Sequence, residues 1–269
     1  MERRTKTAER PNPASEIRYA ELMDQALNLE PGQLQSYNRF YTYSFTNQML
    51  LAMQGVNEPV ATYKRWQDMN RQVMKGSKAK AILRPIAYKE LNEATGQTES
   101  KIRGFKMVNC LFPVSDTEGD PLPEVEPKDW NLSRALGALA INRTPFTETN
   151  GNVQGYSIGN EFAVNPVAPY PFKTTIHEIG HIALGHTAPD AHEDYVRHRG
   201  TKEFQAESTA YIVLNELELT DHMDAGESRA YIRNWLHDEQ PDEAAIKPVF
   251  ATVDRILKAG RAVPEAEGE

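Results

Sequence analysis

Cysteine is almost absent from this sequence, which has 269 residues and one cysteine, Cys110. A single cysteine forms no disulfide within the chain, and its apolar neighbours at 108–112 favour a packing role. No run approaches the roughly 18 consecutive apolar residues of a membrane span. Residues 1–6 are charged and polar and do not lead into an apolar signal core. These absences exclude a disulfide framework and predict a soluble, cytoplasmic protein with no membrane partner.

Acidic residues are scarce in one part of the chain, although the net charge is −8. Residues 1–125 contain 17 lysines and arginines against 15 acidic residues, whereas residues 126–269 contain 13 against 23. No acidic residue lies between Asp68 and Glu90, and this window holds six cations: Arg71, Lys75, Lys78, Lys80, Arg84 and Lys89. We therefore expect a basic surface within an acidic protein.

Hydrophobic spacing and turn residues predict an α+β protein of two domains. Apolar residues at helical spacing predict helices at 16–29 and 45–54, and alternation predicts strands at 80–86 and 104–114 that pair as an antiparallel ribbon. Proline and acidic residues then mark a linker. The predicted order is a disordered tail at 1–15, a first domain at 16–118, a linker at 119–130, a second domain at 131–262, and a disordered tail at 263–269.

The clearest chemical motif is His177-Glu178-Ile179-Gly180-His181. Apolar residues at helical spacing, a proline at 171 and a glycine at 185 predict a helix here. On a helix, residues four apart share a face, so His177 and His181 can bind one zinc ion while Glu178 lies beside them as a general base. The motif predicts a zinc-dependent peptidase acting without a covalent intermediate.

A catalytic zinc ion usually has three protein ligands, so one more is needed. Residues 202–213 predict a second helix, with Glu203 and Glu207 one turn apart on the same face. We assign Glu203 as the third metal ligand, and we expect Glu207 to accept a hydrogen bond from the ring N–H of a ligating histidine that does not face the metal. The reverse assignment stays open.

His186 is the other candidate for a third ligand, in the longer motif His-Glu-x-x-His-x-x-Gly-x-x-His. That motif requires glycine at 184 and histidine at 187, where this chain has Leu184 and Thr187. We therefore interpret His186 as a cation at the helix end or a loop contact. The strand predicted at 161–164 is a candidate edge for binding an extended peptide beside the metal.

Several short motifs, in order, resemble the amino-terminal domain of ArdC-type antirestriction proteins: residues 43–51, Trp66, residues 73–78 and residues 112–122. The second half resembles the metallopeptidase domain that follows it, and the resemblance covers most of 16–215. It implies a single-stranded DNA-binding domain joined to a zincin-like peptidase that protects incoming plasmid or other mobile-element DNA from restriction. The chain departs from the pattern at Met74, where a second basic residue is common, and at 113–116.

Single-strand binding needs cations for the phosphates and aromatic rings for the bases. Candidate cations are Arg71, Lys75, Lys78, Lys80 and Arg84, and candidate rings are Tyr41, Tyr43, Tyr63 and Trp66. With the resemblance, DNA contacts are assigned to Tyr43, Asn47, Trp66, Arg71, Lys75, Lys78 and Lys80. The structural alternative for Trp66 is a place in the core.

Three functions fit these features. The first is a single-stranded DNA-binding antirestriction protein with a zinc metallopeptidase domain and a protein or peptide substrate. The second is a DNA-masking protein whose metal domain is only structural. The third is a repressor-cleaving regulatory peptidase, because the second half also resembles ImmA/IrrE-type metallopeptidases at 177–181 and Glu203.

Overall fold

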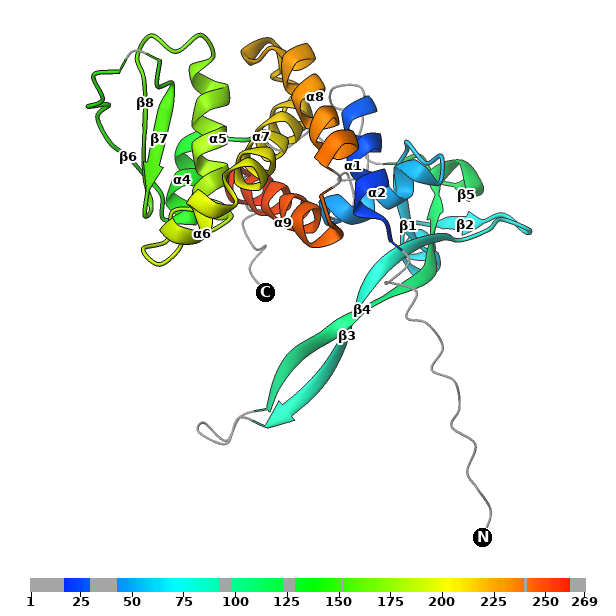
Figure 1. The fold of residues 1–269 in the computed structure, drawn as a ribbon. Coiled ribbons are helices and arrows are strands. Elements are labelled where there is room, and N and C mark those ends of the chain that lie inside the picture. Colours follow the sequence, from blue (N-terminus) through cyan, green and yellow to red (C-terminus); the bar gives the residue numbers. More distant parts are fainter. Residues whose placement is uncertain are drawn as a thin grey trace. The chain divides into compact units, whose positions relative to one another are not determined.

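The computed structural model describes residues 17–29, 43–91, 98–122, 129–150, 152–239 and 241–261. These residues form two compact units (Figure 1). We call Val60–Asp120 the ribbon unit, and we call Tyr19–Pro59 together with Pro121–Glu269 the helical unit. Helices and strands both contribute to the chain, so the predicted mixed class is confirmed. No helix among the described residues is long and apolar enough to span a membrane.

The ribbon unit is built on two long antiparallel strands, β3 (Lys80–Leu91) and β4 (Thr98–Pro113), which form the projecting ribbon in Figure 1. The pairing predicted for 80–86 and 104–114 is confirmed, and the ribbon is longer than predicted because residues 87–91 pair with 98–102. Three short strands and a helix complete the unit: β1 (Val60–Thr62) on β4, β2 (Arg71–Val73) paired with β5 (Thr117–Gly119), and α3 (Tyr63–Asp68).

Trp66 and Arg71 hold the base of the ribbon unit together. Trp66 is 0% exposed, and its indole N–H donates to the carbonyl of Phe112 at 2.9 Å. The Arg71 guanidinium lies 5.9 Å from the Trp66 ring. It donates to Oγ1 and the carbonyl of Thr117, at 2.9 and 3.0 Å, and to the carbonyl of Asp120. Arg71 therefore fastens β2 to the segment that contains β5.

The helical unit has a small sheet and a group of helices. The sheet order is β6-β8-β7, from β6 (Asn142–Arg143), β8 (Glu161–Val164) and β7 (Gly155–Ile158). β8 pairs parallel with β6 and antiparallel with β7, so β7 is an edge strand. The helices after the sheet are α5 (Pro171–Ala183), α6 (His192–Arg197), α7 (Arg199–Glu216), α8 (Ala225–Asn234) and α9 (Glu243–Gly260), and α4 (Leu132–Leu139) precedes it.

Helix α7 is the centre of the helical unit. Every residue from Phe204 to Glu216 is buried, and α7 packs against α5, α8 and α9. A helix that is buried on all sides lies in the core of its unit. Where α7 meets α5, a Cβ added to Gly180 would lie 3.6 Å from the Ala206 backbone. The small residues let the two helices approach closely, which brings side chains of both helices into one site.

Two amino-terminal helices belong to the helical unit. They are α1 (Tyr19–Asn28) and α2 (Phe45–Met53), and both contact α9. The rings of Tyr19 and Phe45 lie 5.7 and 5.5 Å from that of Phe250 in α9. The compact units therefore differ from the predicted domains in residues 19–59. The predicted tails at 1–15 and 263–269, and residues 123–128 of the predicted linker, lie outside the described residues.

A buried carboxyl on α7 makes the stability of the helical unit depend on pH. Burial raises the pKa of Glu216 to about 7, against the opposing effect of Arg261. Because the folded chain then holds a proton that the unfolded chain loses near its ordinary pKa, the free energy of unfolding falls as pH rises from about 4.5 to 7, by about 3 kcal/mol. Urea unfolding of Glu216→Gln at pH 5 and 8 should lack this decrease. The exposed control Glu148→Gln should retain it, and equal pH dependence in all three proteins would contradict the prediction.

Candidate metal centre

Helix α5 carries the first half of the site. Pro171 occupies its first turn, and buried Ile176 and Ile179 hold it to the core. The helix ends at Ala183, and Gly185 follows the C-cap residue Leu184 with a φ of +79°, which suits glycine. The Gly185 N–H donates to the carbonyl of Ile182, and the His186 N–H donates to that of His181, both at 3.0 Å. This pair of bonds is a Schellman motif. It turns the chain back so that His186 lies beside His181.

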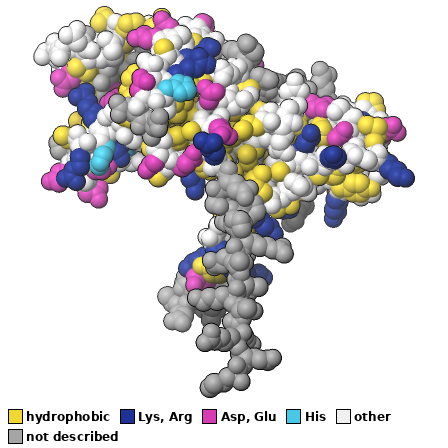
Figure 2. Space-filling model, turned by 45° about the vertical axis from the view of Figure 1, so that its right-hand side comes forward, with side chains coloured by type: hydrophobic (Ala, Val, Ile, Leu, Met, Phe, Trp, Pro, Cys, Tyr) yellow, Lys and Arg dark blue, Asp and Glu magenta, His cyan; other side chains and the backbone are white. Residues whose placement is uncertain are grey.

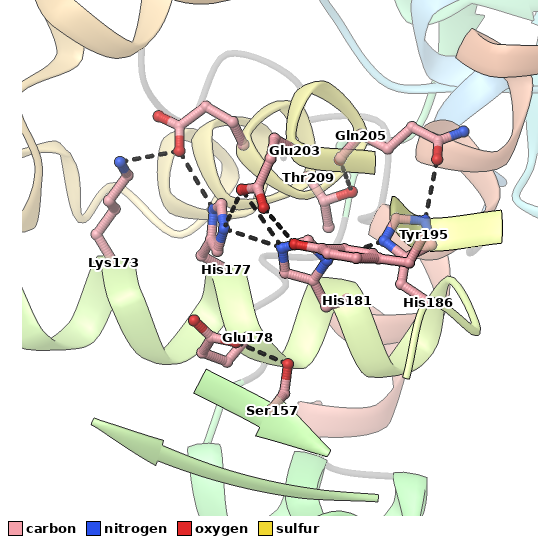
Figure 3. A network of polar contacts seen from close by, with 11 residues as sticks. Ser157, Lys173, His177, Glu178, His181, His186, Tyr195, Glu203, Gln205 and Thr209 are labelled. Carbon is pink, nitrogen blue, oxygen red and sulfur yellow. Dashed lines mark hydrogen bonds and ion pairs between the residues drawn. The ribbon is translucent and has the colours of Figure 1, made fainter. Parts of the chain in front are cut away.

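Helix α7 carries the second half of the site, and Figure 3 shows how the two helices face each other. His177 and His181 point their Nε2 atoms toward each other at 3.1 Å. Glu203 Oε2 lies 3.4 Å from Nε2 of His177 and 3.6 Å from Nε2 of His181. Glu207 instead faces the other side of the His177 ring, with Oε2 3.3 Å from Nδ1. The structure thus places Glu203, not Glu207, against both Nε2 atoms.

The hydrogen bonds around His181 determine which of its nitrogens carries the proton. The Gln205 side-chain amide donates to the carbonyl of Ala245 at 2.7 Å, so its Oε1 faces His186 Nε2, at 3.0 Å. His186 Nε2 must then carry the hydrogen and His186 Nδ1 must accept. His181 Nδ1 lies 2.9 Å from that acceptor and donates to it. His181 Nε2 is therefore left with a free lone pair.

Glu207 orients His177 in the same way. Its Oε2 accepts from His177 Nδ1 and also from Lys173 Nζ, at 2.9 Å, so the neutral His177 ring has its lone pair on Nε2. Two imidazole lone pairs and one carboxylate then converge on one point. Ligands of a tetrahedral zinc ion lie roughly 3.3–3.4 Å apart. The observed separations of 3.1, 3.4 and 3.6 Å fit such an ion.

The pKa values of His177, Glu203 and Glu207 indicate that the position between the histidine Nε2 atoms and Glu203 favours a cation. Burial lowers the pKa of His177, but hydrogen bonds to Glu203 and Glu207 outweigh it and raise the pKa to about 9. Burial raises the pKa of Glu203, but His177, His181 and Tyr195 bring it far below the usual range. The pKa of Glu207 falls to about 2, because His177 and Lys173 outweigh its burial. The metal-free site thus holds ionised carboxylates and a proton on His177.

A cleft of about 1040 Å³ opens over these residues and is also lined by the edge strand β7. Glu178 lies on the α5 face toward β7, and its Oε2 accepts from Ser157 Oγ of β7 at 2.7 Å. A Cβ on Gly155 would come within 3.1 Å of Glu178 Oε1. The prediction that residues 161–164 offer the peptide-binding edge is wrong, because β8 pairs on both sides, and β7 lines the cleft instead.

The sequence motifs did not point to Tyr195 or Gln205, and they gave His186 only a place at the helix end or in a loop. Tyr195 of α6 donates to Glu203 Oε1 at 2.5 Å, which leaves Oε2 directed at the histidines, and burial raises its pKa to about 12. No spacing rule connects it to the motif. Of the two roles expected for His186, a helix-end cation or a loop contact, the first is wrong, because the ring is 5% exposed. Burial lowers its pKa to about 4, so it is neutral. The glycine at 185 was the available signal, because it turns His186 inward.

The residues assigned to DNA belong to both compact units. Trp66 is buried in the core and Arg71 bonds within the ribbon unit, so both side chains have a structural role, and their assignment to DNA contacts stays a prediction. Asn47, at 8% exposed, is buried in α2 of the helical unit. Tyr43 is half-buried in the same unit. Lys75 and Lys78 are exposed and Lys80 is half-buried in the ribbon unit.

Comparisons with known proteins agree with the resemblance. Residues 25–112 match the family model of the N-terminal domain of anti-restriction factor ArdC. The metal-free crystal structure of the antirestriction protein ArdC from plasmid R388 is similar to 90% of this chain and 94% of its own, with 17% identity and a TM-score of 0.53. Its Mn(II)-bound structure covers 90% and 97%, with 16% identity and a TM-score of 0.48. No curated protein sequence matches the chain.

These findings confirm the predicted resemblance to ArdC-type antirestriction proteins, through the matched domain and an ArdC-like fold. The matched residues extend from α1 to β4, so they include parts of both compact units.

Proposed function

We propose that this chain is a cytoplasmic antirestriction protein that binds single-stranded DNA through its first part and hydrolyses peptide bonds with a zinc site in its helical unit. The convergence of His177, His181 and Glu203 beside Glu178 and an open cleft carries the peptidase half of the proposal. The match of residues 25–112 to the ArdC N-terminal domain supports the antirestriction and DNA-binding half.

The residues of the helical unit suit hydrolysis of an extended peptide. His177, His181 and Glu203 would hold the zinc ion, with Glu207, Tyr195 and His186 fixing their orientation. A zinc ion bound there supplies an activated water near neutral pH and polarises the scissile carbonyl. The substrate strand pairs with the free edge of β7. Glu178 then takes a proton from the attacking water and delivers it to the leaving amine.

Removing the metal tests the peptidase half. Chelation should abolish hydrolysis of an unfolded protein substrate such as casein, and zinc should restore it. Zinc should also raise the Tm, because it binds only the folded site. Since the pKa of His177 is about 9 without metal, zinc binding near pH 7.5 should release a proton from that ring. Calorimetry in two buffers with different ionisation enthalpies measures that release.

The metal test has a matched pair of variants. His177→Ala should lose stoichiometric zinc, whereas His222→Ala, at a half-exposed ring outside the site, should retain it. Full hydrolysis by the zinc-free protein would contradict the proposed peptidase. Binding of a single-stranded oligonucleotide by both variants would show that the DNA-binding half stands independently.

A further inference from the structure

The ribbon formed by β3 and β4 has two chemically different faces. Alternate residues of a strand point to opposite faces, and directly paired residues share one. The pairs Arg84↔Lys106 and Tyr88↔Lys101 belong to one face, which we call the basic face. The same face also carries Ile82↔Val108, Ile86↔Gly104 and, toward the end of the ribbon, the acidic pair Glu90↔Glu99. The pairs Leu83↔Met107, Pro85↔Phe105 and Ala87↔Ile102 belong to the opposite, mainly apolar face, which also carries Ala81↔Asn109 and Lys89↔Ser100. The register shifts by one residue between Ile86 and Ala87, because β4 has one extra residue there. This shift keeps Lys101 on the same face as Lys106 and Ile102 on the same face as Phe105.

The basic face places like charges directly opposite each other. Arg84 and Lys106 are cross-strand partners, and both are exposed. Such a pair destabilises a sheet. Residues 80–89 and 101–113 contain no acidic residue, and Lys101 contacts Glu90 at the end of this region. In Figure 2, lysine and arginine side chains lie beside hydrophobic and acidic ones on the parts of the surface that are not grey. An anionic ligand bound between Arg84 and Lys106 would offset the repulsion between these two side chains.

The same face also carries an exposed aromatic ring. Tyr88, opposite Lys101, is 40% exposed. It lies four residues from Arg84, a separation of about 13 Å along a strand. Cations that follow a backbone, next to an aromatic surface, are the features that bind single-stranded nucleic acid without sequence preference. A duplex offers its phosphates but no unstacked base for Tyr88.

We propose that the basic face of the β3–β4 ribbon, with Arg84, Lys101 and Lys106 on the phosphates and Tyr88 against a base, is a binding site for single-stranded DNA. This inference rests on the proposed function, because it assigns the DNA-binding half to a particular surface. That surface is separate from the turn at Lys75 and Lys78, to which the sequence assigned DNA contacts. It also does not include Trp66 and Arg71, whose side chains hydrogen-bond within the ribbon unit.

The like-charge pair allows a test in which binding and stability change in opposite directions. Arg84→Glu places a carboxylate opposite Lys106, so the full-length variant should have a Tm equal to or above that of the parent protein. Its Kd for a fluorescent 20-nucleotide oligo(dT) at 50 mM salt should rise about 10-fold or more, since one phosphate contact becomes a repulsion. Tyr88→Ala should weaken binding about 5-fold or more, whereas Tyr88→Phe should bind as the parent does.

Matched controls separate this site from general charge. Lys64→Glu and Lys247→Glu, at exposed positions that are not part of β3 or β4, should each change the Kd less than 2-fold. The salt dependence of log Kd should become shallower by about 0.7 in Arg84→Glu, as expected for one lost contact to a single strand.

Three results would overturn the inference. Unchanged binding by Arg84→Glu and Tyr88→Ala, with a loss in Lys75→Glu/Lys78→Glu, would move the site to the turn and leave the proposed function intact. A 20-base-pair duplex that binds as tightly as the oligo(dT), or more tightly, would also overturn it. The third such result is binding to anionic phospholipid vesicles that is abolished in Arg84→Glu, while DNA binding by this variant persists. If the parent protein binds no oligo(dT), the DNA-binding half of the proposed function fails as well.

Discussion

Glu178→Gln should reduce hydrolysis of a peptide substrate by about 10²–10⁴-fold or more, because the amide cannot take the proton from the attacking water. The metal content and Tm should remain close to those of the parent protein, since Glu178 is not among the three groups that converge at the histidine Nε2 atoms. Its partner Ser157 can donate to the amide oxygen of glutamine as it does to the carboxylate. The loss should therefore appear in kcat and not in zinc binding.

The matched control for this variant is Glu161→Gln, which removes the same charge from an exposed position on β8 and should hydrolyse at the parent rate. Measuring zinc per chain and oligo(dT) binding in the same preparations separates chemistry from assembly. Hydrolysis at the parent rate by metal-loaded Glu178→Gln would contradict the assignment of Glu178 as the base. Protection of transferred DNA in cells by Glu178→Gln would instead show that the metal site serves antirestriction only as a scaffold.

The sequence predicted the parts of the site that depend on one helix. The spacing of His177 and His181 on an apolar-faced helix determines that they share a side of α5, and the structure has both on that side. The choice between Glu203 and Glu207 depends on how α7 is rotated against α5. A one-turn spacing allows either carboxylate to face the metal, so only the packing of the two helices distinguishes them.

Other features depended on contacts between distant segments and could not be read from the pattern. Trp66 and Arg71 stand among cations and aromatics, yet their partners lie more than 40 residues away, at Phe112 and Thr117. β8 is an inner strand because the two-residue strand β6 pairs with its far side, which leaves β7 as the edge strand that lines the cleft. Helices α1 and α2 precede the ribbon in sequence but pack on α9 near the other end of the chain.

Breaking the hydrogen-bond chain behind His181 should weaken zinc binding without removing a ligand. The chain runs from the carbonyl of Ala245 through Gln205 and His186 to His181 Nδ1. Its direction keeps the hydrogen on Nδ1 and the lone pair of His181 on Nε2. Loss of such an outer contact typically lowers metal affinity about 10–100-fold. We expect a loss of this size for His186→Leu, measured by competition with a chromophoric chelator.

If His186 only filled space, zinc affinity would not depend on which atoms donate and which accept in the hydrogen bonds from Gln205 through His186 to His181. His186→Asn can accept from His181 Nδ1 through its oxygen and donate to Gln205 through its amide, so it should recover most of the zinc affinity that His186→Leu loses. Gln205→Leu should act on the same chain, and the double variant His186→Leu/Gln205→Leu should lose less than the sum of the two single losses. Nitrogen-15 NMR of the metal-free protein reports the His181 tautomer directly. Parent-like zinc affinity in His186→Leu, or equal losses in the leucine and asparagine variants, would show that His186 only fills space. A dominant Nδ1–H form of neutral His181 that is lost in His186→Leu and retained in His186→Asn would establish that His186 determines which nitrogen His181 offers to the metal.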